Sequence, residues 1–534
     1  ASPNFRKCSM DNFFKYIFII FVIGIMIFAF FKMRSDEQEN QQQAQVSDNT
    51  IERVKEIRLG IAEFDTINPI LSNNKNIQDI TKIIYEPLVN LTKDYKATPG
   101  LATEWAKQND TTYIIKLREN VKWSDGERFT AADVQFTIDR LKERNSVYSS
   151  NVQNISLLEI VDDYTIKITL DKEVPFFEYN LIFPILSKTF YETQDFNNTT
   201  IVPVGTGMYK VSDVQPTYIT LTPNTNWWNR DVELSLEKII VNVYSSVGEL
   251  YNSFKIGNVD LISTSNINLQ EYIGTIGYTP KEMKGREHDF IALNTQNYFL
   301  AKQEVRKAIA YSIDRTNIIS SVFNNKYYTS SFPLDYGNWV YQEQDTSSGY
   351  NVEQAKQLLT DNGWVYRNNR GWQKTENYRT QTLALNLVVK ASDATKVSVA
   401  ENIKAQLATQ GIIINVQAYS DEQYNVALTN KAYDMILCSI NLSPSPNMTT
   451  FFGENNLANY KNEEATNIMN EVKNTTDENI IKEKYKRLAE IYKTDIPYIS
   501  LYTNKHTVAY NSALVGTIEP TWFNPYNGIE TWYK

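Results

Sequence analysis

The most informative segment of this chain reads Val121-Lys122-Trp123-Ser124-Asp125-Gly126-Glu127-Arg128-Phe129-Thr130-Ala131-Ala132-Asp133-Val134. Just before it, apolar residues alternate with others from Tyr113 to Leu117, as in a half-buried strand. Gly126 supplies the positive φ angle that a tight turn needs, and Thr130 can cap a helix whose third residue is Asp133. The segment therefore predicts a strand, a turn and a capped helix in immediate succession.

Length and composition indicate a large folded protein with more than one hydrophobic core. The chain has 534 residues, of which 42% are hydrophobic and 22% charged, whereas a single core stops growing at roughly 250–300 residues. The formal net charge is -9 and Lys and Arg form no cluster, which argues against a nucleic-acid partner. The two cysteines, Cys8 and Cys438, are too few for a disulfide framework.

After the N-terminal part, short helical and strand patterns alternate without a fixed repeat, which is typical of a mixed α/β protein. Helices are predicted at residues 131–144, 302–313, 352–362, 397–410 and 463–493, the last with a break near Asn474. Strands are predicted at residues 56–61, 165–170, 239–244, 384–389 and 412–418.

The N-terminal part contains an uncharged apolar run at residues 16–31, flanked by Lys and Arg. It is shorter than the roughly 20 residues of a typical membrane span, and bulky residues at its exit do not suit signal cleavage. We therefore expect an uncleaved signal anchor over residues 1–34, with a cleaved signal or a buried core helix as the alternatives, and Met10 as a candidate native start. Residues 35–55 are polar and Gln-rich and are expected to form a flexible tether. This arrangement predicts an N-terminally anchored protein of the cell membrane, with its folded part on the extracellular or periplasmic side.

The sequence contains no recognisable catalytic or metal-binding motif. Its only two histidines, His288 and His506, lie in no HExxH or similar metal-ligand spacing, and there is no phosphate-binding GxxxxGK[ST] loop or GxSxG elbow. We therefore expect a protein that is not an enzyme and that needs no cofactor and no metal. A secreted hydrolase with paired carboxylates is the alternative from another class.

The segment from Leu117 to Arg140 closely resembles the signature of bacterial extracellular solute-binding proteins of family 5, the oligopeptide- and dipeptide-binding receptors of ABC importers. Further similar segments occur in family order along the rest of the chain. They include Ile84-Tyr85-Glu86-Pro87-Leu88, Val204-Gly205-Thr206-Gly207-Met208-Tyr209, Val305-Arg306-Lys307-Ala308-Ile309-Ala310-Tyr311-Ser312-Ile313-Asp314-Arg315 and Tyr350-Asn351-Val352-Glu353-Gln354-Ala355-Lys356-Gln357-Leu358-Leu359. An ordered series of this kind is far more specific than one matching segment.

The resemblance implies an α/β, two-lobed periplasmic-binding-protein-like fold of class II with an extra inserted subdomain. Lobe I would comprise residues 56–75, 203–286 and 504–534, and the inserted subdomain would comprise residues 76–202. Lobe II would run from residue 287 to residue 503. The chain would then cross between the lobes near residues 288–294 and again near residues 498–503.

The resemblance also places ligand-binding residues where the two lobes meet. The candidates are Glu63, Phe64 and Asp65 after the first strand, His288, Asp289 and Phe290 at the first crossing, Ser439, Asn441 and Ser443 in the segment 433–444, and Tyr502 at the second crossing. Peptide binders of the family carry an acidic residue in this segment that pairs with the ammonium group of the peptide, whereas this chain has Asn441 and Ser443 there. If the ligand is a peptide, Asp65 or Asp289 would have to supply the missing charge, because a buried cation requires a nearby carboxylate.

These features predict the extracellular substrate-binding subunit of an ABC importer. It would act as a monomer and capture an oligopeptide, or a similar small solute, by closing its lobes around it. Its partners would be the solute, a membrane permease with separate ATPase subunits, and the membrane through the N-terminal helix, with no nucleic acid. A peptide-pheromone or sensory receptor and a nickel- or haem-binding receptor of the same fold are the alternatives.

Overall fold

The computed structural model describes residues 24, 26, 29, 32, 54–198, 201–266, 277–334, 337–341 and 349–534. Residues 55–534 form one compact unit, and all the hydrophobic cores described below lie inside it. The predicted signal anchor and tether, together with Cys8, fall almost entirely outside the described residues. Within the described ranges, no helix is both long enough and apolar enough to cross a membrane.

The first part of the unit contains two four-stranded sheets and a short strand pair. One sheet has the order β1-β10-β9-β8, with β1 (Glu56–Ala62) parallel to β10 (Lys238–Tyr244), followed by β9 (Tyr218–Pro223) and β8 (Tyr209–Gln215). The other has the order β4-β5-β7-β6 and comprises β4 (Ala102–Asn109), β5 (Thr112–Leu117), β7 (Thr165–Leu170) and β6 (Ile155–Asp162). The strand pair is formed by β2 (Val89–Leu91) and β3 (Ala97–Pro99).

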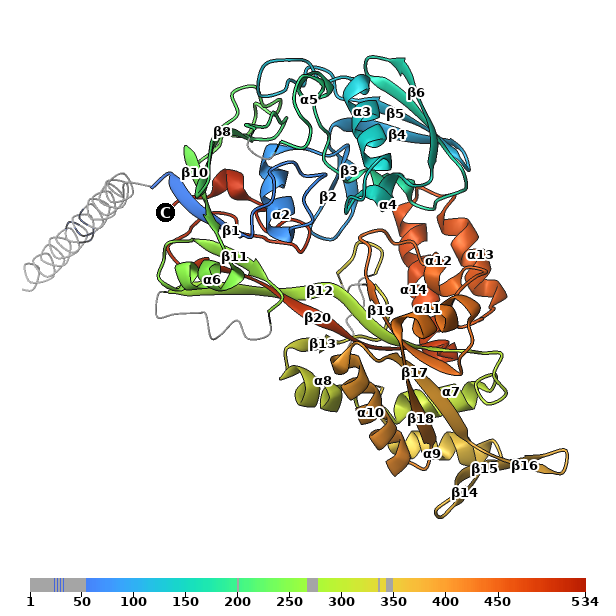
Figure 1. Cartoon of the computed structure of the whole chain (residues 1–534). Coiled ribbons are helices and arrows are strands. Elements are labelled where there is room, and N and C mark those ends of the chain that lie inside the picture. The colour runs from blue at the N-terminus through green and yellow to red at the C-terminus, as the bar shows by residue number, and fades with distance from the viewer. Residues whose placement is uncertain are drawn as a thin grey trace, which may run out of the picture. The chain divides into compact units, whose positions relative to one another are not determined.

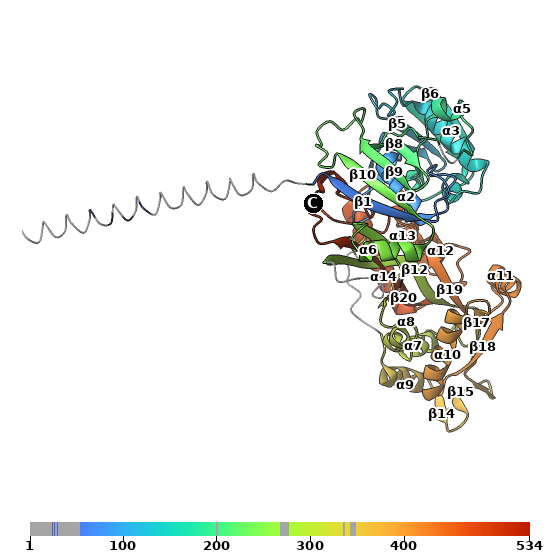
Figure 2. The same cartoon turned by 60° about the vertical axis from the view of Figure 1, so that its left-hand side comes forward.

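A seven-stranded sheet forms the centre of the rest of the unit. Its order is β11-β20-β12-β19-β17-β18, and β13 pairs with β20. The strands are β11 (Leu261–Thr264), β12 (Tyr278–Leu293), β13 (Tyr327–Thr329), β17 (Ala384–Lys390), β18 (Ile413–Tyr419), β19 (Met435–Asn441) and β20 (Tyr498–Asn511). A separate three-stranded sheet comprises β14 (Val365–Arg367), β15 (Gly371–Glu376) and β16 (Arg379–Thr382), and within residues 55–534 it lies at the opposite end from β5 and β6 (Figure 2).

Helices cover the sheets on several sides (Figure 1). In the first part these are α2 (Lys75–Ile84), α3 (Ala131–Lys142), α4 (Ser149–Val152), α5 (Lys188–Glu192) and α6 (Val247–Lys255). Around the seven-stranded sheet they are α7 (Gln303–Tyr311), α8 (Arg315–Phe323), α9 (Val352–Asp361), α10 (Ala394–Thr409), α11 (Asp421–Asn430), α12 (Thr449–Phe452), α13 (Glu463–Val472) and α14 (Glu478–Asp495). Short 3-10 helices occur at Phe177–Leu181 and Ile529–Thr531.

The buried residues divide the unit into two parts, which we call the first and the second lobe. The core of the first lobe takes its residues from positions 57–241, 261 and 508–532. The second lobe has two cores, one on each face of the seven-stranded sheet. Alternate residues of β12 supply them, because Ile291 and Leu293 face one core and Phe290 and Ala292 face the other. The first core therefore joins segments from both ends of the chain, and β12 and β20 run out of the second lobe toward it (Figure 1).

The predicted mixed α/β class and the predicted helices and strands are confirmed, with small changes at their ends. Helix α10 begins before the predicted residue because the Asp393 side chain accepts a hydrogen bond from the Lys396 amide at 3.0 Å and so caps an earlier turn. The break predicted near Asn474 separates α13 from α14, and Asp477 caps the second of these helices.

The strand, turn and capped helix predicted around Val121–Val134 are confirmed as well. Gly126 has a φ of 100°, and its amide bonds to the Trp123 carbonyl at 2.9 Å to close the turn. The Thr130 amide donates to the Asp133 carboxylate at 2.8 Å, as the capping pattern requires. Trp123 is buried in the first core, so this segment links local structure directly to the packing of the first lobe.

Candidate functional site

The strands β12, β19 and β20 bring most of the predicted site residues together. In the antiparallel ladders, Asp289 pairs with Ser439 on one side and with Tyr502 on the other. Glu287 pairs with Asn441 on β19. The β12–β20 ladder is irregular between Lys284 and His288 and again between Asp289 and Phe290. We call this irregular part of the three strands, from Lys284 to Phe290 with its neighbours, the strand crossing.

The first irregularity has a visible cause in the side chain of Asn504. A Cβ atom added at Gly285 would lie 2.0 Å from Asn504 Oδ1, so any other residue there would have to displace this side chain. Asn504 Oδ1 also accepts a hydrogen bond from the Glu287 amide at 3.1 Å. A side chain thus replaces part of the backbone ladder where the strands pass between the lobes, which is typical of a bulge that redirects a strand.

Asp289 lies inside this crossing in a buried ion pair with Lys396 of α10. The side chain of Asp289 is 1% exposed and that of Lys396 is 11% exposed. Lys396 also contacts Glu287 at 3.0 Å. Although burial alone would lower it, the pKa of Lys396 is raised by these two carboxylates, so the lysine is charged. The carboxylate of Asp289 is therefore already matched by a cation of the chain itself.

Glu287 differs from Asp289 because its side chain is 39% exposed. One of its oxygens accepts a hydrogen bond from Ser439 Oγ at 3.4 Å, and its partner in the ladder is Asn441. Ser439 and Asn441 are exposed too. The strand crossing therefore presents one accessible carboxylate beside exposed hydroxyl and amide groups, a combination that can bind an amine or another hydrogen-bond donor.

His288 and Phe290 point to the face of β12 opposite Asp289. His288 is fully buried, with Nε2 3.3 Å from Ser500 Oγ and the ring stacked on Phe290. Burial, helped by the nearby cations Lys284, Arg286 and Arg315, lowers the pKa of His288 to about 3, so the imidazole is neutral.

Phe290 packs edge-on against Phe451 and Tyr498, and Tyr502 packs against Phe323 and Tyr327. Phe290 and Tyr502 are completely buried in the two cores of the second lobe. In the described conformation these aromatic side chains stabilise the crossing by packing.

Arg286 is a residue at this crossing that the sequence did not single out. It is 3% exposed, and it donates to the carbonyls of Leu442 and Ser443 at 2.8 and 2.9 Å. Its guanidinium lies 5.1 Å from the ring centre of Tyr95 and 5.2 Å from that of Phe523. Since both aromatic residues come from outside the second lobe, Arg286 joins the segment after β19 to the first lobe by cation–π contacts.

The predicted residues Glu63, Phe64 and Asp65 lie directly after β1, at the end of another sheet. Glu63 is exposed and has a φ of 55°, and Phe64 is half-buried against the first core. The Asp65 carboxylate accepts hydrogen bonds from the Thr66 amide at 2.7 Å and the Ser72 hydroxyl at 2.8 Å. In the described part of the chain, no hydrogen bond or ion pair joins these three residues to the strand crossing.

Sequence reasoning missed Glu287, Lys396, Arg286 and Asn504. Glu287 directly precedes the predicted triplet, so alternation along the strand could have placed it on the same face as Asp289. The other three residues carry no such signal, because the groups that they contact are distant in sequence. Lys396, for example, lies 107 positions from Asp289.

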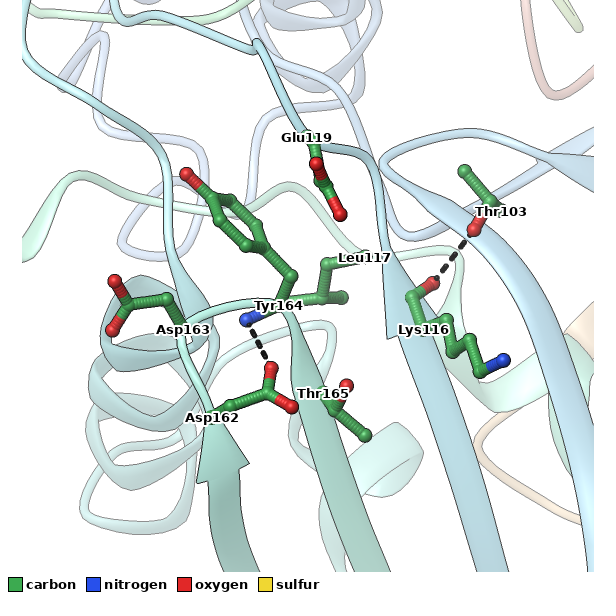
Figure 3. Close-up of a pocket in the computed structure, with 8 residues that line it drawn as sticks. All are labelled: Thr103, Lys116, Leu117, Glu119, Asp162, Asp163, Tyr164 and Thr165. Atoms are coloured by element: carbon green, nitrogen blue, oxygen red, sulfur yellow. Dashed lines mark hydrogen bonds between the residues drawn. The ribbon is translucent and has the colours of Figure 1, made fainter.

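Two surface hollows lie away from this crossing. The larger one, of about 750 Å³, is lined by Thr103, Lys116, Leu117, Glu119, Asp162, Asp163, Tyr164 and Thr165 (Figure 3). Its hydrogen bonds are local, such as that from the Tyr164 amide to Asp162 at 2.8 Å. The other, of about 460 Å³, is lined by Asn294, Asn386, Val388, Gln417, Tyr419, Lys431, Ala432, Tyr433 and Asp434. Neither hollow is lined by a predicted site residue. Across the described residues, no group of three or more His, Cys, Asp or Glu side chains is arranged to hold a metal ion.

Comparison with known proteins gives consistent matches over most of the chain. The family model described as bacterial extracellular solute-binding proteins, family 5 Middle, matches residues 96–461. The oligopeptide-binding protein AppA of Bacillus subtilis is 24% identical, over 89% of this chain and 90% of AppA. Heme-binding protein A of Haemophilus influenzae is also 24% identical, over 80% of this chain and 82% of that protein. The crystal structure of NikZ from Campylobacter jejuni in complex with Ni(L-His) shares the fold, with a TM-score of 0.58, 21% identity and coverage of 90% of this chain and 99% of NikZ.

Proposed function

We propose that this chain captures an oligopeptide for an ABC importer. The premise is that the chain belongs to the bacterial extracellular solute-binding proteins of family 5. Members of this family are substrate-binding receptors rather than enzymes, and we propose no catalytic step for this chain. The relatives differ in the ligands that their names give, which are oligopeptides, haem and nickel. Our choice among these ligands therefore rests on the side chains at the strand crossing.

The observation that carries the proposal is the exposed Glu287 carboxylate beside Ser439 and Asn441. The ammonium group of a peptide requires a carboxylate, and hydroxyl and amide groups can bind the adjacent peptide bond. Asp289 is less suited to this role because its side chain is buried against Lys396, and Asp65 is bound within its own turn. Glu287 contacts the same lysine at 3.0 Å, but two carboxylates share this one cation, and Glu287 is the exposed one of the two. Glu287 thus becomes our candidate for the acid that the family otherwise places near position 441.

Lobe closure around the solute is the mechanism that we propose. Two strands, β12 and β20, connect the second lobe to the first, and a solute that contacts both lobes favours the closed arrangement by its differential affinity. We propose lobe boundaries at residues 287 and 503, with residues 76–202 as an inserted part of the first lobe. The protein would work as a monomer and deliver its solute to the permease and its ATPase subunits.

The proposed location is the outer face of the cell membrane, with residues 1–34 as the anchor and residues 35–55 as the tether. The uncharged apolar run at residues 16–31, with positive charges on both sides, supports this location. Intact-mass analysis of the protein from native membranes tests it. An N-terminus beyond residue 31 would show that the run is a cleaved signal instead.

The ligand class is tested with residues 55–534, which contain all the cores of the folded unit. Native mass spectrometry identifies any retained solute, and calorimetry then compares free peptides, N-acetylated peptides, Ni(II)–histidine and haemin. We expect free peptides to bind and to raise the unfolding temperature, and small-angle scattering to show compaction. Binding of haemin or Ni(II)–histidine without any peptide binding would overturn the peptide assignment.

The role of Glu287 is tested by Glu287→Gln, with Glu282→Gln on the same strand as the matched control. Glu282 is exposed and pairs with Lys505 at 2.8 Å, away from Asn441. We expect Glu287→Gln to weaken binding of a free peptide by about tenfold, equivalent to ~1.4 kcal/mol, and to leave binding of the acetylated peptide almost unchanged. Equal effects of the two variants, or equal losses for free and acetylated peptides, would remove Glu287 from the binding site.

A further inference from the structure

A second contact joins the lobes and begins next to Tyr95, the residue that packs against Arg286 at the strand crossing. It lies between the region from β2 to α5 and the helices α13 and α14 of the second lobe (Figure 1). Glu173 and Lys473, which form an ion pair in this contact, are 300 sequence positions apart, so no local pattern could have indicated it. The strand crossing and this contact both bridge the lobes. An opening motion about the strand crossing must therefore break the second contact.

The contact is centred on Glu173, which bridges a lysine from each lobe. One carboxylate oxygen lies 2.8 Å from Lys473 Nζ at the end of α13, and the other lies 3.2 Å from Lys107 Nζ on β4. Lys107 also donates to Asn474 Oδ1 at 3.2 Å. The side chains of the three ionic residues are only 21–26% exposed, so the cluster is partly shielded from water.

Neighbouring side chains extend the contact. The Trp339 indole N–H donates to the Tyr179 hydroxyl at 2.8 Å, and both residues are buried. The Trp339 amide donates to the Asp94 carbonyl at 2.9 Å. A further ion pair joins Lys96 Nζ to Glu478 of α14 at 2.6 Å. The contact thus combines one buried aromatic hydrogen bond with several partly exposed charges.

We propose that Glu173, Lys107 and Lys473, with the Tyr179–Trp339 hydrogen bond, form a releasable latch that holds the two lobes together and gates solute exchange. The proposal rests on the proposed function, since it assumes that the lobes open and close. Partly exposed ion pairs are weak and screened by salt, so they can break and re-form without unfolding either lobe. The strand crossing cannot do so, because backbone pairing holds β12 to β20 on both sides of its irregular part. The latch therefore sets the population of the closed form even before a solute binds.

The test measures the distance between the lobes in the absence of any ligand. Spin labels at Asp139→Cys on α3 and Asn467→Cys on α13 report this distance by pulsed electron resonance in residues 55–534. Both positions are exposed, and the native Cys438 is buried. We expect a dominant short distance in the otherwise unchanged protein and a larger share of longer distances at high salt.

Variants then assign the effect to the latch. Lys473→Glu places two carboxylates opposite each other and should move most of the population to longer distances, and adding Glu173→Lys should restore most of the short distance. The control is Glu159→Lys, which reverses a charge in an exposed pair with Lys167, 2.7 Å long, within a single sheet of the first lobe. It should leave the distances unchanged.

An unchanged distance in Lys473→Glu, or a dominant long distance in the parent protein, would overturn the latch. Native mass spectrometry of the same variant separates this failure from a failure of the proposed function. If the retained solute still binds and still compacts the variant, solute capture stands and only the latch falls. If no solute binds either protein under any condition, the proposed function falls, while the distance measurement still judges the latch.

Discussion

The strand crossing and the latch join the same two lobes by different physical means. At the crossing, backbone ladders and the buried Asp289–Lys396 pair hold three strands together, while Glu287 and its neighbours beside this pair are accessible to water. At the latch, side chains that are 21–26% exposed, such as those of Glu173 and Lys473, make the contact together with the buried Tyr179–Trp339 hydrogen bond. We therefore propose that the strand crossing persists while the lobes open and that the latch releases. A two-lobed receptor needs both kinds, because solute exchange requires opening and specific binding requires that the lobes return to one arrangement.

Removing the buried cation of the crossing should have the largest effect on stability. Lys396→Met leaves the buried Asp289 carboxylate with no cation beside it, and breaking a buried pair in this way costs about 3–5 kcal/mol. Urea denaturation of residues 55–534 measures this loss. The matched control is Lys404→Met on the same helix, since Lys404 is exposed and only pairs with Glu401. Adding Asp289→Asn to Lys396→Met should recover part of the loss, and a loss below about 1 kcal/mol would mean that the pair does not hold the crossing.

The pH dependence of stability should reveal a partly buried acid near the latch. Burial raises the pKa of Glu178, in the 3-10 helix that carries Tyr179, from 4.5 to about 7. Between these values the folded protein binds more protons than the unfolded chain, so this group stabilises the fold below pH 4.5 and loses that contribution as the pH rises through about 7. We expect Glu178→Gln to reduce this fall by about 1–3 kcal/mol.

Denaturant midpoints measured between pH 4.5 and pH 8 check the Glu178 prediction. Part of the slope should remain in the variant, because burial also raises the pKa of Glu86 to about 7 and that of Asp133 to about 6. An identical slope in the variant and the parent would show that Glu178 is hydrated in solution.

Filling the space at Gly285 should have a smaller, local effect on the crossing. Gly285→Ala must displace the Asn504 side chain and so break its hydrogen bond to the Glu287 amide. We expect a loss of about 1–2 kcal/mol in the free energy of unfolding, the usual cost of leaving a buried donor unpaired. Because Asn504→Ala breaks the same bond, the double variant should lose no more than either single variant, whereas additive losses would contradict the proposed contact.

The segment Val121–Val134 and the strand crossing show what one sequence can and cannot predict. Around Val121–Val134 the turn, the cap and the helix depend on residues a few positions apart, so their spacing was enough to predict them. The same local reasoning predicted five helical and five strand segments that the structure confirms, but it predicted neither β12 nor β20. The family resemblance, and not a local pattern, placed His288, Asp289 and Phe290 at a crossing between the lobes. Local reasoning could not find the partners of these residues, since Ser500 lies 212 positions from His288 and Lys396 lies 107 positions from Asp289.

Residue type alone also misjudges accessibility. Asp289 was expected to offer its charge to a ligand. In the structure its side chain is buried against Lys396, and the exposed carboxylate belongs to Glu287, which lies nearby on the same strand. Alternation along a strand predicts that these two side chains share a face, but it does not predict how deeply each side chain is buried. The candidate site therefore depends on depth within the packed structure, which a linear pattern does not contain.

The smallest effect is expected at the Lys96–Glu478 pair of the latch. Both side chains are more than 40% exposed, and an exposed pair contributes only about 0–1 kcal/mol because water and salt screen it. Lys96→Met should therefore change the free energy of unfolding by less than about 1 kcal/mol, and the change should vanish at 1 M salt, where screening acts over ~3 Å. Urea denaturation at low and high salt measures both quantities. A loss above about 2 kcal/mol that persists at high salt would mean that this contact is as firmly held as the strand crossing, and the two connections between the lobes would then no longer differ in kind.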